Sequence, residues 1–67
     1  MITEIGIAAG DIWQYLDKNG TSTLDQMIKA IGKPRELLLM SMGWLAREGH
    51  ITLVPQGKGY EATLADQ

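Results

Sequence analysis

The stretch KPRELLLMSMGWLAREGHI, residues 33–51, decides the fold of this chain. Pro34 suits the first position of a helix, because its fixed φ is already helical and its missing N–H costs nothing there. Glu36 in the first turn and Arg47 in the last turn both complement the helix dipole. Gly49 tolerates the backbone conformation that ends a helix, so the stretch predicts one long helix that starts at Pro34 and stops before Gly49.

Two further helices are predicted ahead of this stretch, because apolar residues recur there at the spacing of one helical face. Thr3 can cap the first helix and Gly20 can close it. Thr23 and Gln26 fit a capping box at the start of the second helix, which ends at Gly32. The apolar faces comprise Ile5, Ala8, Ala9, Ile12, Trp13 and Leu16 in the first helix, and Leu24, Met27, Ile28 and Ile31 in the second.

The sequence period changes after the long helix. Residues 50–54 and 60–64 alternate polar and apolar side chains, as half-buried strands do. Residues 55–59 lie between them and contain two glycines, which indicates a hairpin loop. Residues 21–23 are too few for an independent strand but can pair at the edge of this small sheet. The side chains expected on the inner face of the hairpin are Ile51, Leu53, Tyr60, Ala62 and Leu64.

The composition limits the kinds of site that the chain can hold. Its 67 residues are enough for one small domain over residues 1–67, and 45% hydrophobic with 21% charged residues is typical of a folded globular protein. The absence of cysteine and the single His50 exclude disulfides and Cys- or His-rich metal sites, so no metal or cofactor is expected. A core of this size supplies only about 3–5 kcal/mol, which leaves association with another subunit as the remaining support.

The charge of the chain bears on its partners and location. Six basic against eight acidic residues give a net charge of −2, whereas DNA-binding domains usually carry a basic excess that neutralises phosphates. Nucleic acid is therefore a possible but disfavoured partner. No apolar run is long enough for a membrane span, and no signal peptide pattern is present. We expect a cytoplasmic protein that does not associate with membranes.

The predicted order of elements resembles the winged helix-turn-helix, a mainly α fold with a small β-sheet. The residues STLDQMIKAIGKPRELLLMSMGWLAREGHI, 22–51, are more narrowly similar to a family of small prokaryotic winged helix-turn-helix proteins of unknown function. Within them, GWLAREGHI resembles the joint between the last helix and the first wing strand of many winged-helix regulators. The resemblance implies three helices, a short first strand and a C-terminal β-hairpin wing, and it implies no particular activity.

The resemblance also implies which side of the third helix would face DNA. In winged-helix regulators the face opposite the core enters the major groove. Aligning the joint at Gly49 puts Leu38, Met42 and Leu45 at core positions. The positions that would face bases and phosphates are Glu36, Leu37, Met40, Ser41 and Gly43. DNA-binding members carry hydrogen-bonding side chains there. In this chain only Ser41 can make such a contact, and phosphate would repel Glu36.

The third helix is apolar nearly all round, so it has to be covered nearly all round. Two short helices and a two-stranded wing cannot cover all of it, and each Leu or Met left in water forgoes roughly 1.5–3 kcal/mol. A two-fold homodimer is the simplest cover, because the same patch then covers itself. The candidate interface residues are Leu37, Leu39, Met40, Gly43 and Trp44. Alternatively, Trp13 and Tyr15 of the first helix cover the third helix within one chain.

We compare three kinds of function with these sequence features. The preferred hypothesis is a non-catalytic winged-helix module that acts through protein–protein contacts, with itself as a homodimer or with another protein. The alternative is a DNA-binding transcriptional regulator that uses the third helix and the wing. Its candidate contacts are Lys33, Arg35, Ser41 and Lys58. An enzyme is not expected, because no nucleophile motif or convergent set of polar groups is present.

Overall fold

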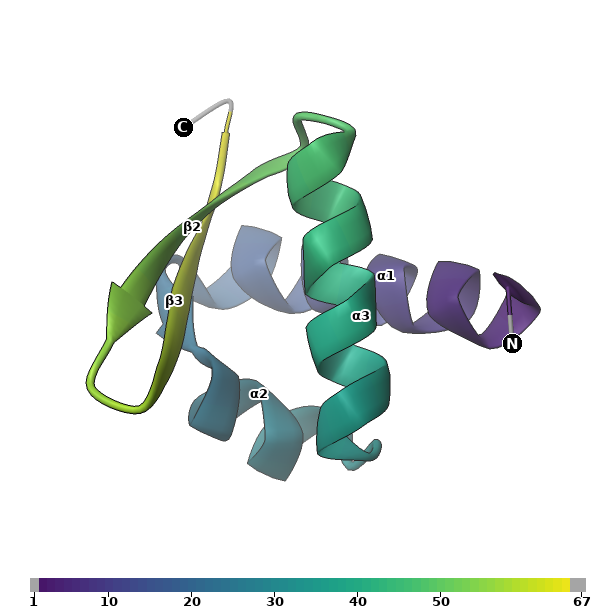
Figure 1. The fold of residues 1–67 in the computed structure, drawn as a ribbon, viewed down its shortest axis with the longest axis horizontal. Helices are drawn as coiled ribbons and strands as arrows, with labels where there is room; N and C mark the ends of the chain where they lie inside the picture. Colours follow the sequence, from purple (N-terminus) through teal and green to yellow (C-terminus); the bar gives the residue numbers. More distant parts are fainter. Residues whose placement is uncertain (1, 66–67) are drawn as a thin grey trace.

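The structure, a computed structural model, describes residues 2–65. It contains three helices and a three-stranded antiparallel sheet with a C-terminal hairpin, which confirms the predicted winged helix-turn-helix (Figure 1). The helices are α1 Ile2–Asn19, α2 Leu24–Ile31 and α3 Arg35–Arg47, and the strands are β1 Ser22–Thr23, β2 Ile51–Gln56 and β3 Gly59–Leu64. The helices pack on one another and on the inner face of the hairpin, which forms the wing.

Most helix ends lie where local chemistry places them. The predicted capping box of α2 is confirmed, because Gln26 N donates to the Thr23 hydroxyl at 3.1 Å and Thr23 N donates to Gln26 Oε1 at 2.8 Å. Gly32 ends α2 with a φ of 76°, a left-handed conformation that glycine adopts without strain. The short connection from Gly32 to Pro34 then joins α2 and α3 into a helix-turn-helix.

Two predicted helix starts are wrong by one or two residues. α1 begins at Ile2, so Thr3 lies inside the helix and is not its cap. Pro34 is the N-cap of α3 and not its first helical residue, since its ψ of 143° is extended. The Pro34 carbonyl still accepts the first helical hydrogen bond, from Leu38 N at 3.1 Å. The fixed φ of proline suits this flanking position as well as it suits the first turn.

The sheet has the strand order β1-β3-β2, so the predicted edge pairing of residues 21–23 is confirmed for Ser22 and Thr23. The hairpin loop is shorter than predicted. β2 runs to Gln56 and β3 starts at Gly59, which leaves a two-residue turn at Gly57 and Lys58. Proline is tolerated within β2 because this strand lies at the edge of the sheet, where a missing N–H breaks no ladder bond.

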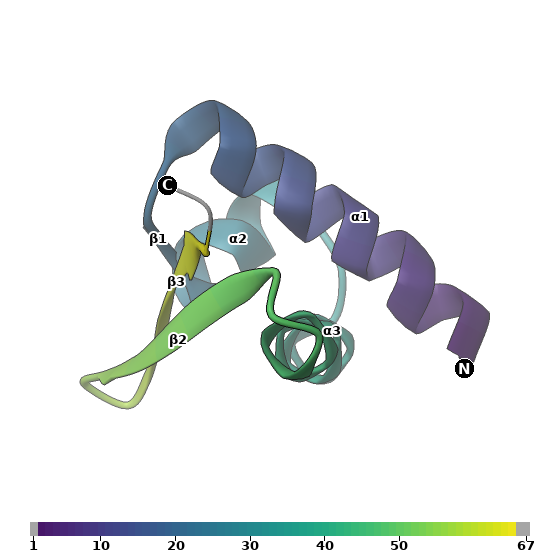
Figure 2. The same cartoon turned by 90° about the horizontal axis from the view of Figure 1, so that it is seen from above.

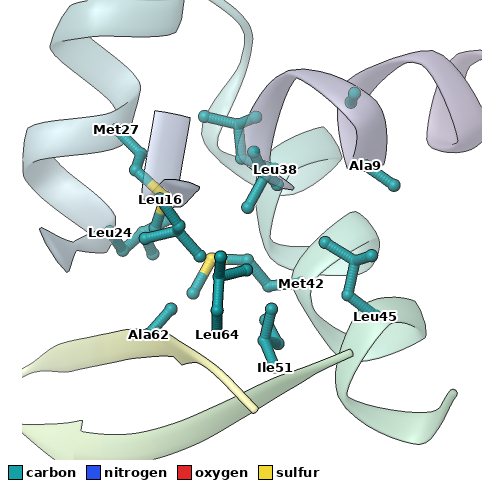
Figure 3. Close-up of a cluster of buried hydrophobic side chains, with 12 residues drawn as sticks. Ala9, Leu16, Leu24, Met27, Leu38, Met42, Leu45, Ile51, Ala62 and Leu64 are labelled. Carbon is teal, nitrogen blue, oxygen red and sulfur yellow. The ribbon is translucent and has the colours of Figure 1, made fainter. Parts of the chain in front are cut away.

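The core lies where the three helices meet the inner face of the hairpin (Figure 3). Figure 3 shows Met42 reaching from α3 toward side chains of α1 and of both wing strands. The buried apolar residues are Ala8, Ala9, Ile12, Leu16, Leu24, Met27, Leu38, Met42, Leu45, Ile51, Ala62 and Leu64. The strand register places Tyr60 on the same face of the hairpin as Ala62 and Leu64, as predicted, but Tyr60 is not part of the core. Tyr60 is exposed, because its pair with Pro55 lies near the hairpin turn, beyond most of the core.

Candidate interaction surface

The outer face of α3 carries large apolar side chains in water. Met40 is 43% exposed and Trp44 is 47% exposed, and Gly43 between them is also exposed. Leu37 and Leu39, the other two predicted interface residues, are half-buried and pack against the core from either side of this face. We call Met40, Gly43 and Trp44 the exposed face of α3. It follows the i, i+3, i+4 spacing of one helical stripe.

Trp44 also forms one wall of a groove between α1 and the C-terminal half of α3. The groove has a volume of ≈ 290 Å³ and its opposite wall is Trp13, which is 41% exposed. The residues that line it are Gly6, Ala9, Gly10, Trp13, Trp44, Leu45 and His50. The Trp44 and His50 rings lie 6.4 Å apart at an interplanar angle of 41°. No Asp, Glu, Lys or Arg is among the groove's lining residues.

The contribution of α1 to this surface is absent from the sequence-based prediction. The sequence pattern assigns Trp13 to the apolar stripe of the first helix, but the buried stripe is narrower and consists of Ala8, Ala9, Ile12 and Leu16. The position of Trp13, about 100° round the helix from Ile12, is the signal that could have identified it. Trp13 and Tyr15 therefore do not cover α3 fully, since Trp44 remains about half exposed.

The prediction that Ser41 could contact DNA does not agree with its position in the structure. The resemblance places it on the outer face of the third helix, but it is fully buried between α3 and α1. Its hydroxyl lies 2.8 Å from the Leu37 carbonyl and 3.2 Å from the Ile5 carbonyl, and its single proton is shared between these two acceptors. The physical reason is position: Ser41 lies about 60° from Leu38 on the helix, within the arc that α1 covers.

Two of the remaining DNA-contact candidates come together. Arg35 and Lys58 line one cleft between the start of α3 and the hairpin turn, with a volume of ≈ 510 Å³. Asp25 of α2 lines the same cleft and partly offsets their charge. Lys33 lies apart from them, with its Nζ 3.6 Å from an Asp11 carboxylate oxygen, so an acidic neighbour also offsets its charge.

The described residues offer no group of three His, Asp or Glu side chains arranged to hold a metal ion. Over residues 2–65 no helix combines the length and apolar character that crossing a membrane would take. Three surface features are therefore candidates for binding a partner. They are the exposed face of α3, the groove between α1 and α3, and the cleft between the start of α3 and the hairpin turn.

Comparison with known proteins identifies the chain at the level of its family. A family model described as "Winged helix-turn-helix domain (DUF2582)" matches residues 1–63. Winged helix domains are generally non-catalytic. The comparison with curated proteins gives no match, and the comparison with solved structures gives none either.

Proposed function

Because the chain belongs to this family of winged helix-turn-helix domains, we propose that it is a non-catalytic interaction module that forms a homodimer through the exposed face of α3. The observation that carries the proposal is the stripe of Met40, Gly43 and Trp44 on the helix that would read DNA in a winged-helix regulator. Met40 and Gly43 offer none of the strong donors and acceptors that base edges require, and Trp44 offers only its indole N–H, so the stripe suits a protein surface better.

The residue types on this face suit an interface. Tryptophan is among the side chains that dominate binding energy in protein interfaces, and methionine repacks easily against different neighbours. Gly43 presents open space, since a Cβ built there meets no atom within 4 Å. A partner backbone can therefore approach α3 closely at this point. The half-buried Leu37 and Leu39 lie at the margins of the same face.

The test is sedimentation equilibrium over a range of protein concentration. The wild-type chain is expected to associate, and Met40→Glu and Trp44→Glu are expected to raise the dissociation constant by at least tenfold by placing a charge in the interface. Val54→Glu on β2 is the matched control, because Val54 is similarly exposed at 52% but lies on the wing. Equal masses for wild type and the two α3 variants, all folded by circular dichroism, would remove the interface from α3.

A second candidate function is DNA binding, which one specific observation favours. Arg35 and Lys58, from segments far apart in the sequence, line the same cleft beside the wing. A duplex that lay across them would be held through phosphates, so its affinity should fall steeply as salt rises. Absence of binding to random duplex at low salt and high protein concentration would dispose of this candidate, and a loss on Arg35→Glu would support it.

A further inference from the structure

Three helical glycines have no explanation within the part of the chain that the structure describes. Gly6 and Gly10 in α1 and Gly43 in α3 do not have positive φ, and a Cβ built at any of them meets no atom within 4 Å. Glycine inside a helix costs about 1 kcal/mol relative to alanine. Neither backbone conformation nor packing within residues 2–65 requires glycine at these positions. Close contact with a second molecule would.

Gly6 and Gly10 lie at the surface that Trp13 and Trp44 enclose. They are four residues apart, so they lie one above the other on one flank of α1 and form part of the groove floor. With no side chains at these positions, another helix can bring its backbone close to α1 while the tryptophans contact its sides. Ala9, the other α1 residue in the floor, is also small. The groove can therefore accommodate a helix of another molecule.

The same flank of α1 also carries a large, exposed apolar side chain near its start. Ile2 is 87% exposed, and the first turns of α1 extend past α3 (Figure 2). Ile2, Gly6 and Trp13 are spaced i, i+4, i+11, which places all three on one side of the helix. One flank therefore holds a protruding apolar residue at its start, glycines in its middle and a tryptophan farther on. Two copies of such a flank are complementary when they run in opposite directions.

We propose that two copies of this chain pair through antiparallel α1 helices, with Gly6 of each copy opposite Gly10 of the other. This register is two-fold symmetric, so each contact occurs twice. It places Ile2 of one copy, one turn before Gly6, against Trp13 of the other copy and the neighbouring Trp44. The inference rests on the proposed self-association and extends the interface from α3 to α1.

The area that a dimer needs explains why both helices take part. A stable interface buries about 800 Å² on each partner, which is close to a fifth of the 4385 Å² surface of this chain. The 18 residues of α1 make a strip about 27 Å long and about 10 Å wide, which is too small by itself. The exposed face of α3 adjoins this strip through Trp44, so the two together form one continuous surface.

The glycines provide a test in which folding and association respond in opposite directions. In the double variant Gly6→Ala, Gly10→Ala, the monomer should unfold at a higher temperature, because alanine is the better helix former. The added methyl groups should push the paired helices apart and raise the dissociation constant at least tenfold by sedimentation equilibrium. A merely structural role would move stability without this opposite change. Ala30→Gly on α2, outside the groove, is the control and should lower stability with an unchanged dissociation constant.

The register has its own test. Ile2→Lys alone should raise the dissociation constant, because it places a charge against the partner's tryptophans. Combining it with Trp13→Glu in the same chain should return the dissociation constant toward that of the wild type, since the lysine introduced in each copy would then face the glutamate introduced in the other. Failure of the pair to recover association, with folding intact by circular dichroism, would overturn this register.

The outcomes separate this inference from the proposed function. If the wild type dimerises and the glycine variants do so equally well, the α1 pairing is wrong while the α3 interface stands. If the wild type stays monomeric at every concentration, the proposed homodimer fails, and the α1 pairing fails with it.

Discussion

α3 has two faces that both carry large apolar side chains and differ in what covers them, and the outer face also holds the exposed Glu36 and Arg47. One face holds the buried residues Leu38, Met42 and Leu45, which α1, α2 and the wing enclose. The other holds the exposed Met40 and Trp44. The comparison shows that a domain this small uses only part of the apolar surface of α3 to fold. The rest is available for association, because burial and not side-chain type determines what a residue contributes.

Met40 and Met42 give this comparison a matched pair, since they are the same side chain two positions apart on one helix. Met42 is fully buried at the centre of the core (Figure 3). Met40 is nearly half exposed. Any difference between them in a stability measurement therefore comes from what surrounds each side chain. It does not come from helix propensity or residue volume.

The largest effect is expected from Met42→Ala. Truncating a buried methionine removes about 2–5 kcal/mol, and a domain of this size has a core worth only about 3–5 kcal/mol. The variant should be largely unfolded at 25 °C in urea denaturation followed by circular dichroism. Met40→Ala in monomeric protein should change the free energy of unfolding by less than about 0.5 kcal/mol. Equal losses for the two would show that the faces do not differ as described.

The difference between these faces could be predicted from the sequence, because the helical period groups Leu38, Met42 and Leu45 on one side and the resemblance at the Gly49 joint implies that this side faces the core. The capping box of α2 was equally predictable, since it depends on two residues three positions apart. The position of Trp13 was not. Its angle of about 100° from Ile12 places it at the edge of the apolar stripe, but whether a residue at that edge is covered depends on how closely α1 crosses α3, which Ala8 and Ala9 permit.

Ser41 shows a different limit. Its angular position places it near Leu38, but its polar side chain and the resemblance to DNA-binding regulators favour the outer face. The structure resolves the conflict through hydrogen bonds. A buried serine is tolerated when its hydroxyl has partners, and here the Leu37 and Ile5 carbonyls provide them. Whether such acceptors exist depends on tertiary contacts, so sequence alone could not supply this answer.

An intermediate effect is expected from Ser41→Ala, which tests the boundary between the two faces. Losing the hydroxyl removes hydrogen bonds worth about 0.5–1.5 kcal/mol net, including the one that joins α3 to α1. The urea midpoint should fall accordingly, at every protein concentration. Thr52→Ala on the exposed side of β2 is the comparison and should leave the midpoint nearly unchanged. An unaltered midpoint for Ser41→Ala would mean that this hydroxyl contributes nothing to the packing of α3 on α1.

The smallest effect is expected from Gly43→Ala, and its sign depends on protein concentration. In dilute monomer the substitution should raise the free energy of unfolding by about 0.5–1 kcal/mol, because alanine has less conformational freedom to lose and space is available for its Cβ. At concentrations where the chain associates, stability includes the free energy of association. A methyl group that holds a partner away from α3 should then shrink or reverse the gain. A gain of equal size at both concentrations, measured by urea denaturation, would mean that no backbone approaches Gly43 and that the exposed face of α3 has no partner at this point.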